Sequence, residues 1–311
     1  MRTDVIAKVG RVVALCAALA VLFSLLLLAV RPWYLSWGAT AGEAAATLAG
    51  DELLGAPDPS TRGVRVAPRV STRAITIEAP ANKVWPWLLQ LGQDRGGFYS
   101  YELLENMVGT NMRNVDVLRP ELQQWKLGDK LWMYPPDKLS GAGHGVLQRL
   151  DPGRALVFGT RQIGTSTAQP TDGTWAFIVQ PIATSTTRLI VRGRSVAVRS
   201  AAQRAFDRLV FEPMHFVMER KMMEGIKARA EGRAATPATD VLEVLMFATC
   251  FALFVGAVVR IVRWPTARRS LLVIMIAGLA FQLLTFVQPP WIVGLLIVLS
   301  LVVLFEVVHY A

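Results

Sequence analysis

Apolar residues are concentrated in four stretches of the chain. Residues 12–30 form a run of 19 positions without a charged side chain, and ranges 241–262, 271–287 and 291–308 are nearly as apolar. A helix rises about 1.5 Å per residue, so about 20 apolar residues cross the ~30 Å hydrocarbon core of a bilayer. The pattern therefore predicts four transmembrane helices and a multi-pass protein of the cell membrane.

These stretches divide the chain into four parts. We expect an N-terminal transmembrane anchor at 1–31, a linker at 32–72, a soluble domain at 73–235 and a C-terminal transmembrane region of three helices at 241–309. The linker is rich in Ala, Gly, Pro and Asp. Such a composition favours an extended lead from the membrane, with one short helix at 41–48.

The first apolar run also allows a second interpretation, a cleaved signal peptide with a small-residue cleavage site at Ala39-Thr40-Ala41. Its apolar run is longer than the ~7–15 residues usual in signal peptides. Arg31-Pro32-Trp33-Tyr34 follows directly and is typical of an interfacial anchor with aromatic side chains at headgroup depth. We therefore interpret the run as an anchor.

The placement of arginine and lysine predicts the orientation. Arg2, Lys8 and Arg11 precede the first run, and Arg260, Arg263, Arg268 and Arg269 lie between the second and third. Because basic flanks stay in the cytoplasm, the segment 32–240 is predicted to be extracytoplasmic. This segment carries about half of the net charge of +10, which suits a surface close to anionic headgroups and equally an ordinary, mildly basic domain.

The middle segment contains a series of strand patterns separated by turn residues. Residues 71–78 alternate polar and apolar side chains, the period of a half-buried strand. Asp151-Pro152-Gly153 and Ala183-Thr184-Ser185-Thr186 are hairpin connections, so the strands around them are predicted to be antiparallel neighbours. The remaining strands are expected at 126–134, 145–150, 155–160, 173–180 and 187–194.

Helical spacing appears on both sides of these strands. A helix capped by Asn82 and a second helix at 100–108 capped by Ser100 follow the first strand. A long helix at 201–232, broken only at Pro213, ends the domain. Its predicted apolar face consists of Phe206, Val210, Met214, Val217, Met218, Met222, Gly225 and Ile226, with Lys221 among them.

The order of a strand, two short helices, antiparallel strands and a long C-terminal helix is that of the α+β helix-grip fold. In this fold a curved antiparallel sheet wraps around a long helix.

The sequence also resembles the SRPBCC superfamily, the group of START, polyketide cyclase and pollen-allergen-like domains, and within it membrane-associated bacterial proteins. The resemblance covers about residues 38–232 and rests on 72–80 (TRAITIEAP), 84–88 (VWPWL), 90–101 (QLGQDRGGFYSY), Gly128-Asp129, 173–177 (GTWAF) and 212–220 (EPMHFVMER). It implies a cavity that binds a hydrophobic molecule, and it carries over no activity residue by residue.

The segment 90–101 gathers polar and aromatic residues around three glycines. Arg95 is a candidate for holding a carboxylate or phosphate, and Tyr99 and Tyr101 for closing the mouth of a cavity. The alternative is a tight turn whose aromatic side chains fill the core, with Arg95 paired to Asp94, Glu102 or Glu105 at the surface.

Other ligand-binding candidates lie on the long helix and on the sheet. Met214, Met218 and Met222 offer an adaptable apolar surface, which a long core helix would present equally well. Trp175 is large and apolar, and we expect it to face the cavity. Arg192 and Arg194 alternate on one strand, where the outer face of the sheet is the ordinary position for arginine.

The long helix also carries the best acid–base candidates of the chain. Glu212, His215 and Glu219 are spaced by three and four residues, so one face presents a histidine between two carboxylates. Arg220 and Lys221 beside them favour a solvated, salt-bridged face instead. We therefore keep Tyr99, Tyr101, His215 and Glu219 as weak catalytic candidates.

The composition excludes several classes of site. Both cysteines, Cys16 and Cys250, lie in predicted spans, so the soluble domain has neither a disulfide nor a thiol nucleophile. With three histidines in the chain we expect no zinc site and no cofactor. Nucleophile-elbow, zinc-protease, P-loop, dinucleotide and nucleic-acid motifs are absent from the sequence.

Three hypotheses remain open. The first is a membrane-tethered binding module that takes a lipid or another hydrophobic small molecule close to the bilayer. The second is a cyclase- or hydratase-type enzyme acting on an apolar substrate. The third is an envelope domain that binds another protein. Because the chain lacks a catalytic signature, we favour the first.

Overall fold

The computed structural model describes residues 2–54, 69–159, 173–195, 200–233, 237–264 and 269–310. The chain forms two compact units, one of residues 1–30 with 236–311 and the other of residues 31–235. The expected strand residue Thr160 and the Pro- and Asp-rich part of the linker at 55–68 lie outside the described residues.

The first unit is helical. It contains α1 (Arg2–Leu35) as far as Val30, together with α7 (Pro237–Arg263), α8 (Ser270–Val287) and α9 (Trp291–Tyr310). Within the described residues, four helices are long and apolar enough to cross a membrane, and they correspond to the four predicted spans. The helices therefore support association with a membrane.

Small residues let the helices of this unit approach one another. A methyl group at Gly278 of α8 would collide with the ring of Phe23 of α1. The same ring packs edge-on against Phe254 of α7, with 5.6 Å between the ring centroids. Close approach at glycine is a common way of packing helices in a membrane, because apolar side chains gain little there from leaving lipid.

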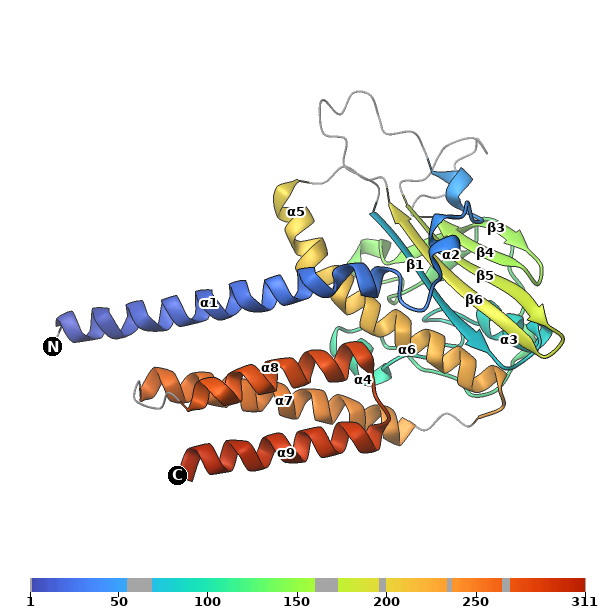
Figure 1. Cartoon of the computed structure of the whole chain (residues 1–311). Coiled ribbons are helices and arrows are strands. Elements are labelled where there is room, and N and C mark those ends of the chain that lie inside the picture. Colours follow the sequence, from blue (N-terminus) through green and yellow to red (C-terminus); the bar gives the residue numbers. More distant parts are fainter. Residues whose placement is uncertain are drawn as a thin grey trace. The chain divides into compact units, whose positions relative to one another are not determined.

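The second unit has an α+β architecture built on one open sheet. All six described strands are antiparallel to their neighbours, in the order β1-β6-β5-β4-β3-β2 (Figure 1). The strands are β1 (Arg69–Ile77), β2 (Lys130–Trp132), β3 (His144–Asp151), β4 (Ala155–Gly159), β5 (Gly173–Ala183) and β6 (Thr186–Ser195). Five strands agree closely with the alternation and turn signals in the sequence.

The strand predicted at 126–134 is shorter than expected. Its first four residues form a turn instead, in which the Asp129 amide donates to the Lys126 carbonyl and the Asp129 carboxylate accepts from the Lys126 amide. Gly128 adopts a φ of 94°, which glycine reaches without steric cost. β2 therefore begins only at Lys130, directly after this turn.

The helices of this unit are α2 (Ala41–Ala45), α3 (Ala81–Leu89), α4 (Glu102–Met107), α5 (Ala201–Phe206) and α6 (Glu212–Ala230), with 3-10 turns η1 (Asp51–Leu53), η2 (Pro120–Leu122) and η3 (Leu139–Gly141). Both predicted caps are wrong. Pro80, whose φ is fixed near the required value, precedes α3 in place of Asn82. The Ser100 hydroxyl donates a hydrogen bond to the Met218 carbonyl at 2.9 Å and does not cap α4, which begins only at Glu102.

The long C-terminal helix is interrupted one turn earlier than expected. A π-helical turn, η4 (Asp207–Phe211), separates α5 from α6, and Pro213 lies in the first turn of α6. Proline lacks an N–H and its ring crowds the carbonyl four residues before it, so the preceding turn widens.

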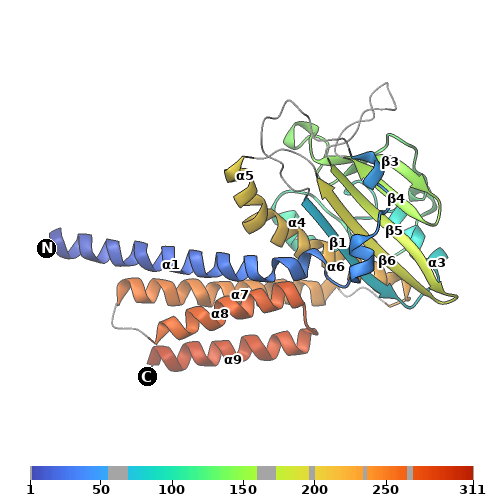
Figure 2. The same cartoon turned by 45° about the horizontal axis from the view of Figure 1, so that its top comes forward.

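The two faces of the sheet are covered by different segments (Figure 2). On one face, α3 and α6 enclose the main core, in which Ile75, Ile77, Phe158, Phe177 and Met222 are buried. On the other face, residues 39–53 pack Leu48 and Leu53 against small side chains such as Ala74 and Ala176. The short helix expected at 41–48 is present as α2 (Ala41–Ala45), whereas the expected extended lead is wrong for residues 39–53, which belong to the same compact unit as the sheet.

Candidate functional site

Arg95 stabilises the fold of its own neighbourhood. Its Nη2 donates to the backbone carbonyls of Leu89 at 3.0 Å, of Gln124 at 3.4 Å and of Leu122. The guanidinium carbon also lies 4.3 Å from the centre of the Trp125 ring. Burial lowers the pKa of this arginine from its usual value. These hydrogen bonds tie α3 to the loop at 122–125, and Arg95 does not form the ion pairs predicted with Glu102 and Glu105.

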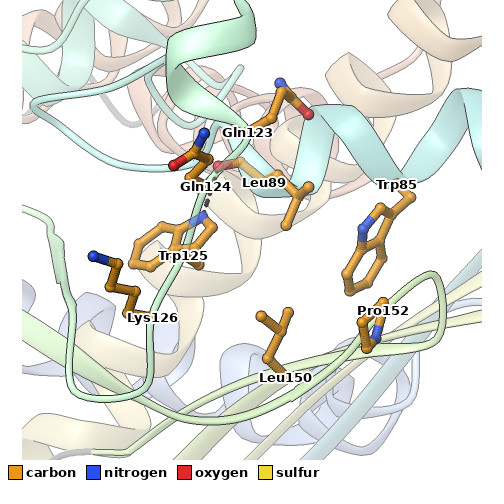
Figure 3. Close-up of a pocket in the computed structure, with 8 residues that line it drawn as sticks. All are labelled: Trp85, Leu89, Gln123, Gln124, Trp125, Lys126, Leu150 and Pro152. Atoms are coloured by element: carbon orange, nitrogen blue, oxygen red, sulfur yellow. Dashed lines mark hydrogen bonds between the residues drawn. The ribbon is translucent and has the colours of Figure 1, made fainter.

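That loop forms one wall of a hollow at the edge of the core (Figure 3). The hollow has a volume of about 320 Å³. Trp85 and Leu89 of α3 face Trp125 of the loop, and the turn after β3 closes the space; the lining residues are Trp85, Leu89, Gln123, Gln124, Trp125, Lys126, Leu150 and Pro152. The Trp125 indole N–H donates to the Leu89 carbonyl at 2.7 Å, which fixes the ring.

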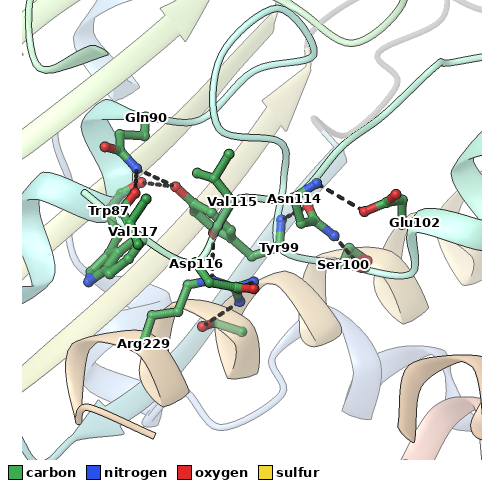
Figure 4. A network of polar contacts seen from close by, with 11 residues as sticks. Trp87, Gln90, Tyr99, Ser100, Glu102, Asn114, Val115, Asp116, Val117 and Arg229 are labelled. Carbon is green, nitrogen blue, oxygen red and sulfur yellow. Dashed lines mark hydrogen bonds and ion pairs between the residues drawn. The ribbon is translucent and has the colours of Figure 1, made fainter. Parts of the chain in front are cut away.

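The two tyrosines predicted to close a cavity mouth are core residues. Tyr99 and Tyr101 are both fully buried. The Tyr99 hydroxyl donates to the Trp87 carbonyl at 3.2 Å and lies 3.4 Å from the Gln90 amide nitrogen, and burial raises its pKa to about 12 (Figure 4). The ring of Tyr101 lies under the Lys221 ammonium, 4.7 Å away. Neither hydroxyl is placed to serve as an acid or base for a substrate at the surface.

Tyr99 also has an unusual backbone, with a φ of 57°. Its amide donates to the Asn114 side-chain oxygen at 2.7 Å, and the Asn114 amide group donates to the Ser100 carbonyl at 2.9 Å (Figure 4). Arg229 of α6 lies over the Tyr99 ring at 4.6 Å and forms an ion pair with Asp116 at 2.6 Å. This network holds the glycine-rich segment against α6, which agrees with the tight-turn interpretation.

The methionines of α6 occupy three different environments. Met222 is buried in the main core, Met218 is half-buried, and Met214 is 58% exposed. They therefore do not form one cavity wall. None of the three lines the hollow at Trp85 and Trp125.

Trp175, His215 and Glu219 come together around a buried arginine that sequence reasoning missed. Arg73 of β1 forms an ion pair with Glu219 at 2.5 Å, and the two side chains are 2% and 1% exposed. The Trp175 indole N–H donates to the other Glu219 oxygen at 2.8 Å. A sequence signal existed, because Arg73 has the same strand parity as Ile75 and Ile77 and so must face the core. Such an arginine needs a buried carboxylate.

His215 of this cluster is partly exposed, with a side chain 34% accessible to solvent. Its Nε2 lies 3.7 Å from Glu219 Oε2, and its Nδ1 lies 3.5 Å from Arg73 Nη1. A guanidinium only donates, so Nδ1 faces Arg73 as an acceptor. That lone pair is thus turned toward the buried arginine.

Glu212, the other carboxylate of the trio, binds the end of α1 and does not pair with His215. Arg31 donates to it twice, from Nε at 2.7 Å and from Nη2 at 3.0 Å. Arg73 in turn donates to the Tyr34 carbonyl at 2.8 Å. The predicted solvated face is therefore wrong for Glu212 and Glu219, which are buried.

Arg192 and Arg194 lie on the outer face of the sheet, as expected. Both pair with Asp51 at 3.1 Å, and Arg188 pairs with Glu43 at 2.7 Å. These pairs attach residues 43–51 to β6 and leave no role for the arginines in the core. Among the described residues, no group of three His, Cys, Asp or Glu side chains could hold a metal ion.

No protein-family model matches the sequence, and no curated protein matches it. Among solved structures, protein MLL2253 from Mesorhizobium loti is 13% identical, with a TM-score of 0.29 over 54% of this chain and 100% of its own. A Polyketide_cyc-like protein from Corynebacterium glutamicum, Cgl2372, is 13% identical, with a TM-score of 0.23 over 52% of this chain and 85% of its own. Neither likeness is close enough to assign a function.

Proposed function

We propose that residues 31–235 form a membrane-tethered, helix-grip binding domain for a hydrophobic small molecule or lipid. The observation that carries the proposal is the hollow between Trp85 and Trp125. Five of its eight lining residues are apolar, and its volume of about 320 Å³ lies at the small end of ligand pockets in proteins. The interior between α6 and the sheet is filled by core side chains, so we assign binding to this edge.

The lining suggests the chemistry of the ligand. Two indole rings face each other across the space, with Leu150 and Pro152 below them (Figure 3). Indole surfaces suit a flat ring or the end of an acyl chain. Gln123, Gln124 and Lys126 complete the lining, and their two amides and ammonium would meet a polar or acidic group of the ligand. We infer an amphipathic ligand with an apolar body and a small polar or anionic end.

Arg95 fits this proposal as a positioning residue. Arg95 does not line the hollow. Its hydrogen bonds to the Leu122 and Gln124 carbonyls and its contact with the Trp125 ring hold the wall of the hollow in place. The anchoring role that the sequence suggested for Arg95 is thereby replaced by an indirect one.

The test uses the full chain purified in mild detergent. Native mass spectrometry and solvent extraction measure the co-purifying apolar compounds. Leu150→Arg places a charge inside the hollow and is expected to abolish their retention. Ile182→Arg is the matched control, because Ile182 is an exposed apolar residue that does not line the hollow. Equal retention by both variants, or an empty wild-type protein, would contradict the proposal.

A second candidate is proton transfer by His215, favoured by its partial exposure beside the buried Glu219. His215→Asn would then abolish turnover of an apolar substrate while leaving retention of the compound unchanged. The orientation of Nδ1 toward Arg73 argues against this role, so we rank it below binding.

A further inference from the structure

An exposed apolar strip runs along α5, η4 and the start of α6. It consists of Phe206, Val210, Phe211 and Met214, whose exposed fractions are 57%, 39%, 42% and 58%. Phe206, Val210 and Met214 recur every four residues, so their side chains follow one side of the segment. Contiguous exposed apolar side chains are typical of surfaces that contact a membrane or another protein.

The end of the strip at Phe211 and Met214 adjoins residues that contact the end of α1, a candidate membrane span. Glu212 lies between Phe211 and Met214 in the chain and accepts two hydrogen bonds from Arg31. Phe216, one turn further on, packs against Trp33 and Tyr34, with ring centroids 5.5 Å apart in both pairs. Arg31 to Leu35 are the last residues of the candidate span Val12–Leu35. Side chains fixed to this end of the span are therefore held at the depth where the span leaves the hydrocarbon.

The charges of the segment suit a lipid surface. Within Ala201–Phe211, the acidic residue is Asp207, which is buried, while Arg208 is exposed and Arg204 is half-buried. Exposed apolar side chains combined with basic ones are the composition of interfacial helices, which lie in the plane of the membrane and favour anionic headgroups.

We propose that this strip inserts into the headgroup region of the bilayer in which α1 is anchored. The occupant of the apolar surface is lipid, and the contact fixes the face that residues 31–235 turn toward the membrane. The inference is independent of the ligand hollow, because the strip and the lining of the hollow have no residue in common.

The experiment uses the full chain in nanodiscs of phosphatidylcholine and phosphatidylglycerol. Cys16→Ala and Cys250→Ala remove the native thiols, and Phe206→Cys, Val210→Cys and Met214→Cys each receive a nitroxide label. Ile182→Cys is the control, since Ile182 of β5 is 59% exposed and outside the strip. Collision with oxygen, which concentrates in lipid, is compared with collision with a water-soluble nickel complex.

Labels on the strip are expected to collide more with oxygen than with nickel, and the label at residue 182 to show the reverse. Nickel access at all three strip positions equal to that at residue 182 would overturn the proposal. So would protection from both reagents, which would mean that protein covers the strip. All four positions are exposed, so the labels should not disturb folding, and unchanged thermal unfolding of each labelled protein verifies this.

Discussion

The guanidinium of Arg95 stacks on the indole of Trp125, 4.3 Å from the ring centre. The same guanidinium is bonded to carbonyls on both α3 and the loop at 122–125. An arginine in this arrangement contributes through fixed hydrogen bonds and ring contact, which lysine cannot reproduce.

Arg95→Ala is therefore expected to destabilise the protein by about 2 kcal/mol, since hydrogen bonds to charged groups contribute roughly 1.5–3 kcal/mol. For a unit of this size that lowers Tm by roughly 4–8 °C. Thermal unfolding followed by circular dichroism measures the change. Arg113→Ala removes an exposed arginine and should leave Tm unaltered. A normal Tm for Arg95→Ala would show that Arg95 does not hold the loop.

The strands and spans could be predicted from the sequence because periodicity and length are local properties. The short helix in residues 39–53 could be predicted too, but the packing of this segment on the sheet could not be, since Ala39, Leu48 and Leu53 show no helical or strand period. Their contacts depend on the outer face of the sheet, where Ala74 and Ala176 leave room. The site was harder still. Whether Arg95 meets a ligand or a carbonyl depends on where residues 122–124 return in space, and no local pattern encodes that.

Two glycines in helices should respond oppositely to alanine. At Gly225 of α6 a methyl group would collide with the Tyr99 carbonyl and approach the Tyr99 Cβ to 2.9 Å. Gly225→Ala should cost about 1–3 kcal/mol, the usual effect of overpacking. At Gly42 of α2 the nearest atom is 3.9 Å away, so Gly42→Ala should be neutral or stabilise the fold by up to about 1 kcal/mol. Urea unfolding of both variants measures the difference. Equal effects would mean that α6 does not pack on Tyr99.

Acid should weaken the attachment of residues 43–51 to the sheet. The hydrogen bond from Arg188 lowers the pKa of the Glu43 carboxyl from 4.5 to about 2. Because the folded pKa is the lower one, the carboxylate stabilises the fold above pH 4.5, and this stabilisation is lost as the pH falls toward 2. Glu43→Gln should thus flatten the fall in Tm over this range. Glu121→Gln, at an exposed carboxylate, should retain the wild-type slope; if it flattens the curve equally, Glu43 is not responsible.

The orientation in the membrane remains a prediction from the basic flanks. Alkaline phosphatase fused after Arg233 should be active, because this enzyme folds only outside the cytoplasm, and green fluorescent protein at the same point should be dark. Fusions after Arg263, beside Arg260, should give the opposite pattern. Activity confined to the cytoplasmic reporter at Arg233 would reverse the assignment.

Arg73 and Glu219 form a buried ion pair in which each charge depends on the other. Removing one partner leaves the other charge buried without compensation, which typically costs about 3–5 kcal/mol. Glu219→Gln and Arg73→Met should each show this loss in urea unfolding. The double variant Arg73→Met/Glu219→Leu should recover much of it, because an apolar pair of similar volume needs no hydration. The recovery distinguishes an ion pair from two independent packing positions.

The exposed pair of Arg149 and Glu52 provides the matched control. Its atoms lie 2.7 Å apart, nearly as close as in the buried pair, but the side chains are 39% and 46% exposed. Glu52→Gln should therefore change stability by about 0–1 kcal/mol, since water screens the pair. A loss at Glu219 no larger than that at Glu52 would mean that water reaches the interior beside Trp175. The Arg73–Glu219 pair would then be hydrated, and His215 beside it would be open to a substrate.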